Sequence, residues 1–116
     1  MTPHEQMFEL LGGLVDGRVF PGIAEPETLT PYITFQIIGG PPINFVTGEK
    51  PVKRFVRVQV NTWAATSIEA SNVAMQAEDA IRAAKLLQPE VLTGAADTYD
   101  EEIEYRGALQ EFMLFL

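Results

Sequence analysis

The chain has 116 residues, enough for one domain with its own core and too few for two, so we expect a single domain spanning residues 1–116. Apolar residues make up 47% of it and cysteine is absent, which favours an ordinary globular protein and excludes disulfide scaffolds, thiolate zinc sites and cysteine nucleophiles. The formal net charge of −8 repels polyanions and argues against a dedicated nucleic-acid binder.

The first expected element is a helix from about Pro3 to Val15. Thr2 is the expected N-cap, Pro3 suits the first helical position, and Glu5 is placed to complete a capping box. The apolar residues at helical spacing are Met7, Phe8, Leu11, Leu14 and Val15.

No signal-like N-terminus and no membrane-length apolar run is present, so we expect a cytoplasmic protein without membrane contact.

A long, proline-rich connection from Gly17 to Pro31 follows, with a short edge strand expected at residues 18–20. The residues from Tyr32 to Ile38 alternate as a strand does, with Ile33, Phe35 and Ile37 on one face.

The loop from Gly39 to Pro51 is longer than hairpin loops usually are. It carries the apolar pair Phe45 and Val46. Such a pair near a loop tip favours an interaction surface, whereas a loop that folds back and buries its own side chains is the commoner alternative.

The next strand covers residues 52–64, VKRFVRVQVNTWA, and holds three of the eight basic residues. Val56, Val58 and Val60 share one face, as in a half-buried strand. The basic residues lie on both registers near the start of the strand, so they do not form a flat platform for nucleic-acid bases.

A second helix is expected over about Ser67 to Leu86, opened by a capping box of Thr66 and Glu69. Its apolar stripe is mostly alanine, which allows close approach to a sheet: Ala70, Val73, Ala74, Ala77, Ala80, Ile81 and Ala84.

Two further strands close the chain. Residues 89–94 read as a short strand, residues 95–104 as an acidic turn region, and residues 103–116 as a strand with apolar residues on both faces. That last pattern indicates a central strand, a bulge near Gln110 and Glu111, or a face covered by another subunit.

The order of the expected helices and strands along the chain predicts an α+β fold, with two helices on one face of a mainly antiparallel sheet of about four strands.

No catalytic or cofactor site is expected. His4 is the only histidine, the only serines, Ser67 and Ser71, lie in the second helix, and neither glycine pair matches a phosphate-binding motif. The acidic group lacks the spacing of a calcium loop, so no metal is expected. The prediction is a protein that is not an enzyme.

Charge is unevenly distributed along the chain. Lys50, Lys53 and Arg54, with Arg57, are half of all the basic residues. The acidic residues Asp97, Asp100, Glu101, Glu102 and Glu104 crowd one stretch of eight residues. This favours head-to-tail self-association or an oriented partner, although two solvated loops of opposite sign would produce the same pattern. We therefore take these two clusters, with Phe45 and Val46, as candidate interface residues.

Four segments resemble a family of small tailed-phage and prophage tail-completion proteins, similar to tail terminators and tail-to-head joining proteins. They are GRVFP at 17–21, LTPYI at 29–33, RVQVNTWA at 57–64 before an alanine-rich helix, and FMLF at 112–115. The positions that mark the pattern are Arg18, Pro21, Pro31, Tyr32, Gln59 and Trp63.

The resemblance implies a non-enzymatic assembly protein that forms a ring, expected to be sixfold, at the head-proximal end of the tail. Its implied partners are copies of itself, the tail tube protein and the head connector, and its implied locations are the host cytoplasm during assembly and the virion tail. DNA would pass through the ring without specific binding. The alternatives are a monomeric module that holds a peptide against a sheet edge and, less favoured, a small-molecule enzyme.

Overall fold

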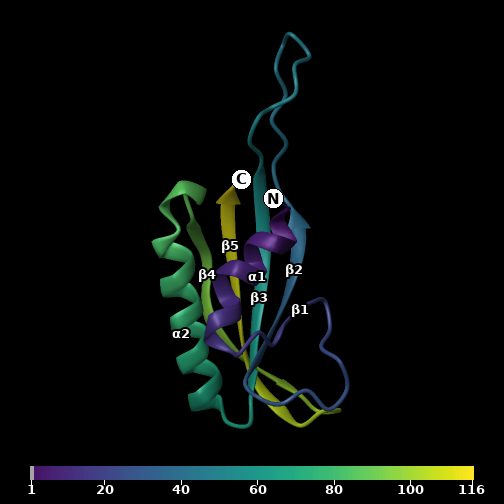
Figure 1. Ribbon diagram of the computed structural model, residues 1–116, viewed down its shortest axis with the longest axis vertical. Coiled ribbons are helices and arrows are strands. Elements are labelled where there is room, and N and C mark those ends of the chain that lie inside the picture. The colour runs from purple at the N-terminus through teal and green to yellow at the C-terminus, as the bar shows by residue number, and fades with distance from the viewer. Residues whose placement is uncertain (1) are drawn as a thin grey trace.

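The computed structural model describes residues 2–116 as a five-stranded sheet with two helices on one of its faces (Figure 1). The strand order is β1-β2-β3-β5-β4. β1 (Val19–Pro21) pairs in parallel with β2 (Tyr32–Gly39), and the other neighbouring strands, β3 (Phe55–Ala64), β4 (Glu90–Asp100) and β5 (Tyr105–Phe115), pair antiparallel. The predicted α+β class is confirmed, and the fifth strand, β1, lies where the short edge strand was expected.

Helix α1 (Pro3–Leu11) begins as its cap residues predict. The Thr2 hydroxyl accepts a hydrogen bond from the Glu5 N–H, and a Glu5 carboxylate oxygen accepts one from the Thr2 N–H. The α-helix ends four residues earlier than expected because Gly12 and Gly13 are poor helix formers, and residues 12–14 form a tighter 3₁₀ turn instead.

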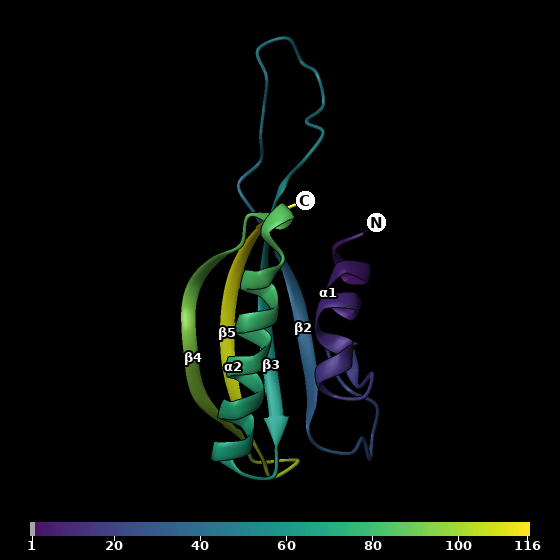
Figure 2. The ribbon, with the colours of Figure 1, turned by 60° about the vertical axis from the view of Figure 1, so that its left-hand side comes forward.

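Helix α2 (Ser67–Ala83) packs along the sheet beside β5 and β3 (Figure 2). The Thr66 hydroxyl caps it by accepting from the Glu69 N–H, and the helix gives way to a 3₁₀ turn at Lys85–Leu87. Five of the seven residues of the predicted stripe are buried, namely Ala70, Val73, Ala74, Ala77 and Ile81. Small side chains at these positions let the helix lie close to the strands.

The core lies between the helices and one face of the sheet. Val58 and Val60 of β3, Phe112 and Leu114 of β5 and Phe35 of β2 are buried there. Residues of α1, β1 and α2 join the same cluster. No helix of residues 2–116 lies on the other face of the sheet, which we call the open face.

The antiparallel pairing of β3 and β5 is continuous from Phe55 opposite Phe115 to Ala64 opposite Arg106. β5 is therefore a central strand of the sheet without a bulge at Gln110 and Glu111. The remaining alternative, a face of this strand covered by another subunit, stays a prediction. The irregularities occur in β4 instead, between Val91 and Thr93 and between Thr93 and Ala96.

The segment expected to be an acidic turn is for the most part strand. β4 continues to Asp100, and only residues 101–104 form the turn into β5. The prediction stopped the strand at Gly94 because the polar residues after it show no buried face. Their backbone is nevertheless paired with β5, and ladder hydrogen bonds do not require a buried side chain.

Candidate functional site

Residues 40–54, which we call the finger, project beyond the end of the sheet between β2 and β3 (Figure 1). Its tip is a turn in which the Gly48 N–H donates to the Phe45 carbonyl at 3.0 Å. At its base the Arg54 N–H and C=O exchange hydrogen bonds with the backbone of Leu116 at 2.8 and 2.9 Å. Between these points the two sides of the finger form no strand ladder.

Three large apolar side chains of the finger are exposed, whereas Ile43 is half-buried. Phe45 is half exposed, and Val46 and Val52 are fully exposed. The finger therefore does not fold back over its own side chains, which was the commoner of the two alternatives for the loop. Apolar side chains held away from the body of a protein favour a contact with another molecule.

The basic residues of the finger lie along its return side and at its base. Lys53 places its Nζ 5.8 Å from the centre of the Phe115 ring, and Phe115 in turn lies 4.8 Å from the Phe55 ring. Among the described residues, Lys50, Lys53 and Arg54 make no ion pair, in contrast to Arg57, which pairs with Glu111 on the open face. Three cations are thus free to meet a partner.

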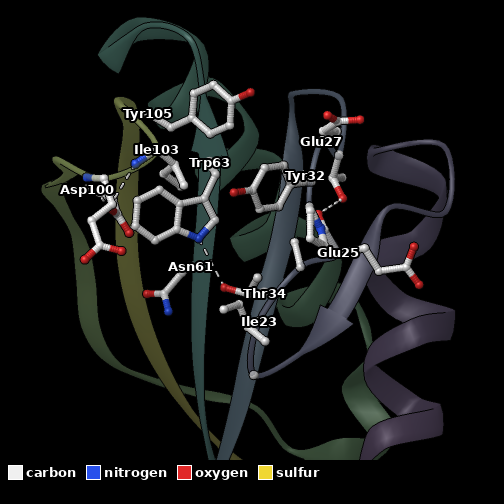
Figure 3. A pocket seen from close by; sticks show the side chains of 15 residues that line it. Ile23, Glu25, Glu27, Tyr32, Thr34, Asn61, Trp63, Asp100, Ile103 and Tyr105 are labelled. Atoms are coloured by element: carbon white, nitrogen blue, oxygen red, sulfur yellow. Dashed lines mark hydrogen bonds between the residues drawn. The ribbon is translucent and has the colours of Figure 1, made fainter.

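The opposite end of the open face is hollowed into a cleft of about 640 Å³ (Figure 3). Its floor is formed by side chains of β2, β3 and β5, and its sides by residues 22–28 and by the end of the β4–β5 hairpin. Figure 3 shows Tyr32, Trp63 and Tyr105 gathered in the cleft, with Asp100 and Ile103 on one side and the loop of Glu25 and Glu27 on the other.

Aromatic contacts build the floor of the cleft. The Tyr32 and Tyr105 rings meet edge to face at 6.1 Å, and the Trp63 Nε1–H donates to the Thr34 hydroxyl at 3.1 Å. Burial, more than the nearby Tyr105 and Asp100, raises the pKa of Tyr32, so its hydroxyl is a neutral donor at physiological pH.

The electrostatic character of the cleft is one-sided. Glu25, Glu27, Asp100 and Glu102 line it, and no lysine, arginine or histidine does. Asp100 is held in place because its Oδ1 accepts hydrogen bonds from the Glu102 and Ile103 N–H groups. The Asn61 Oδ1, also in the cleft, is buried and has no hydrogen-bond partner. The cleft therefore offers acceptors and negative charge to a guest that brings donors.

The predicted acidic cluster is divided by the structure. Asp100 and Glu102 line the cleft, and Asp97, Glu101 and Glu104 do not. Asp97 pairs with Ala108, whose side chain faces the helices, so Asp97 belongs to the opposite face of the sheet. The two charged clusters of the sequence analysis lie at opposite ends of the molecule and do not meet within one chain.

Sequence reasoning missed the cleft as a site. Tyr32 and Trp63 were noted only as markers of a fold pattern, and Glu25 and Glu27 were not singled out at all. Where the connection from 17 to 31 returns to the sheet, the Arg18 side chain donates to the Pro31 carbonyl at 3.0 Å. Only the alternation that places Tyr32, Thr34, Asn61 and Trp63 on one face could have hinted at the floor of the cleft.

Among residues 2–116 no cluster of three histidine, aspartate or glutamate side chains could hold a metal ion. His4 is exposed on α1, with its ring 5.8 Å from the ring of Phe35. No helix within residues 2–116 has the length and apolar character to cross a membrane.

The structure is a small α+β domain with an exposed finger at one end and a cleft at the other. In the comparison with family models, the model described as tail completion protein gp17 matches residues 4–115. The chain belongs to this family and is a phage tail completion protein, associated with other components of the phage tail. No curated protein matches the sequence.

Proposed function

We propose that this protein forms a closed ring, with six copies, on the head-proximal end of the phage tail and joins that end to the head connector. It acts by binding alone and catalyses no reaction. The proposal rests on one observation above all: the chain matches the tail completion family over nearly its whole length while presenting complementary surfaces at its two ends.

The arrangement of charge supports head-to-tail contacts. The finger, with Lys50, Lys53 and Arg54, leaves the sheet where β3 begins, and the acidic residues gather where β3 ends and β5 begins. The ten paired residues of β3 separate these regions by about 30 Å. One patch that meets a different patch on the next copy is a heterologous contact, which closes into a ring when the rotation per copy allows it.

The net charge of −8 suits a ring through which DNA passes, because a negatively charged channel does not retain a polyanion. We expect no specific binding of duplex DNA at physiological salt. The same ring would be soluble during assembly in the host cytoplasm and would remain in the virion tail.

The experiment that tests the proposal combines charge reversal with electron microscopy of purified, incomplete tails. Reversal of Lys50, Lys53 and Arg54 to glutamate should leave the monomer folded and abolish ring formation and tail joining. Reversal of Asp100, Glu101 and Glu102 to lysine in the same chain should restore part of the assembly. Each exposed ion pair contributes up to roughly 1 kcal/mol to the free energy of association, and the contribution is repeated at every contact around the ring.

Normal assembly of the triple reversal would mean that these cations are only solvated. Failure without rescue would assign the basic residues to the tail tube or the head connector instead of a neighbouring copy. Circular dichroism of each variant is the control for folding. A wild-type protein that neither binds tails nor forms rings would overturn the proposed function itself.

A second candidate function is a monomeric peptide-binding module, favoured by the exposed outer edge of β4, which could accept an added strand. The two irregularities in β4 interrupt that edge and make it a poor template. A monomer that binds peptides and shows no oligomer at any concentration would support this alternative.

A further inference from the structure

We propose that the cleft on the open face is the receptor for the finger of a neighbouring copy, with Phe45 inserted among the aromatic rings and Lys50 held by the carboxylates of the rim. This inference rests on the proposed function and deepens it, because it assigns the contact between copies to a particular cavity and a particular guest.

The chemistry of the cleft defines the guest. Its floor is aromatic, and its rim carries Glu25, Glu27, Asp100 and Glu102. A guest that suits both features is apolar at its end and positively charged beside that end. An acidic or purely apolar guest would leave the carboxylates of the rim without a counter-charge.

The finger has this composition in the required order. Its turn exposes Phe45 and Val46 at the tip, and Lys50 follows two residues after Gly48. The backbone N–H groups on either side of the tip are not engaged in a strand ladder, so they are available as donors. A cavity of about 640 Å³ lies within the range of roughly 300–1,000 Å³ in which proteins bind compact guests.

A finger cannot enter the cleft of its own chain. The ladder of β3 and β5 lies between them, and Figure 1 shows the finger directed away from the sheet at the end opposite the β4–β5 hairpin. The finger that enters the cleft must therefore belong to a second copy, whose basic residues complement the acidic rim. Because every copy carries one finger and one cleft, each contact leaves a free finger and a free cleft for the next copy.

Disulfide trapping tests the contact directly, since the natural chain contains no cysteine. The double variant with Val46→Cys and Ile103→Cys places one thiol at the finger tip and one in the cleft. Protein assembled on purified tails and then oxidised should give a ladder of covalent oligomers on a non-reducing gel. The matched control pairs Val46→Cys with Met75→Cys, which is 62% exposed on α2 and lies on the other side of the sheet.

A second pair, Thr47→Cys with Glu27→Cys, probes the other side of the cleft and guards against a local effect of one substitution. Adding Lys50→Glu to the first pair should lower the yield of trapped oligomer roughly fivefold, the effect of losing one exposed charge pair. Adding Glu102→Lys to that variant should restore part of the yield.

The outcomes separate this inference from the proposed function. A ladder from both cleft pairs, with none from the Met75 control, supports the finger-in-cleft contact. Rings that complete the tails without any ladder overturn the contact and leave the proposed function standing. Equal ladders from cleft and control pairs would show random collision and also overturn it. If no rings form, both the finger-in-cleft contact and the proposed function are wrong.

Discussion

Arg57 and Glu111 form an ion pair on the open face, between neighbouring strands β3 and β5. The Arg57 guanidinium donates to a Glu111 carboxylate oxygen through both Nε and Nη2. This hydrogen bond is the main reason that the pKa of Glu111 lies below its ordinary value of 4.5. A lowered carboxylate pKa means that the unfolded chain binds the proton more readily than the folded one.

The pair predicts how stability responds to acid. The stabilisation by Glu111 is present above pH 4.5 and is lost as the pH falls through its lower folded-state pKa. We expect the free energy of unfolding of Glu111→Gln to fall less steeply below pH 4.5 than that of the wild type. Urea unfolding at a series of pH values measures both slopes. Identical slopes would mean that the pair does not persist in solution.

Gly107 is needed where the Trp63 ring crosses β5. A Cβ at this position would lie 2.9 Å from ring atoms of Trp63 and 2.9 Å from the Thr98 Cγ2. Since an indole ring cannot shorten or bend, the side chain would have to move as a whole. The floor of the cleft thus depends on a glycine that is not itself part of it.

Gly107→Ala should therefore destabilise the protein by about 1–3 kcal/mol through overpacking and shift the emission of Trp63, the single tryptophan. Thermal unfolding and fluorescence measure the two effects. Gly94→Ala is the matched control on β4, because an added Cβ there meets nothing within 4 Å. If both variants behave alike, the Trp63 ring does not lie against Gly107.

At the scale of elements, α2 and the sheet are separated by a layer of small side chains. Ala70, Ala74 and Ala77 are completely buried. The layer also contains Gln110 of β5, whose Nε2–H donates to the Ala74 carbonyl at 3.0 Å. The closeness of helix and strand leaves no room for larger side chains in this layer.

Ala77→Phe should lower the free energy of unfolding by on the order of 1–3 kcal/mol, because the ring must enter the layer between α2 and the sheet. Chemical denaturation measures the change. Met75→Phe, on the exposed side of the same helix, should stay within about 0.5 kcal/mol of the wild type. A variant at Ala77 that is as stable as its control would show that this face of α2 does not pack on the sheet.

The two edge strands of the sheet, β1 and β4, are short or irregular. β1 has three residues and ends in Pro21, and β4 carries two irregularities in its register. Short, interrupted and proline-containing edges resist the addition of a foreign strand. Neither edge strand is therefore a good template for an added strand.

For the whole molecule, we predict one cooperative unfolding transition. The core cluster draws residues from α1, β1, β2, β3, α2 and β5, so none of these elements can leave without exposing the others. Far-ultraviolet circular dichroism and Trp63 fluorescence should report the same midpoint on heating. Two well-separated transitions would contradict a single domain spanning residues 1–116.

Much of the fold could be predicted because local sequence patterns indicate where its helices and strands lie. The caps at Thr2 and Thr66 located the helix starts, the alanine stripe identified the buried side of α2, and the alternation of residues 32–38 and 56–60 located the core faces. These features depend on neighbours within a few positions along the chain, where side-chain periodicity and capping chemistry operate.

The candidate site could be predicted only in part. The sequence by itself indicated the charged clusters, the exposed loop and the family. Tertiary structure decided that the basic and acidic clusters lie at opposite ends, that Asp97 and Asp100 face opposite sides of the sheet, and that residues 22–28 return to make a cleft over Trp63. Such proximity arises from strand pairing and loop closure between residues far apart in the chain, and no local periodicity encodes which distant segments meet.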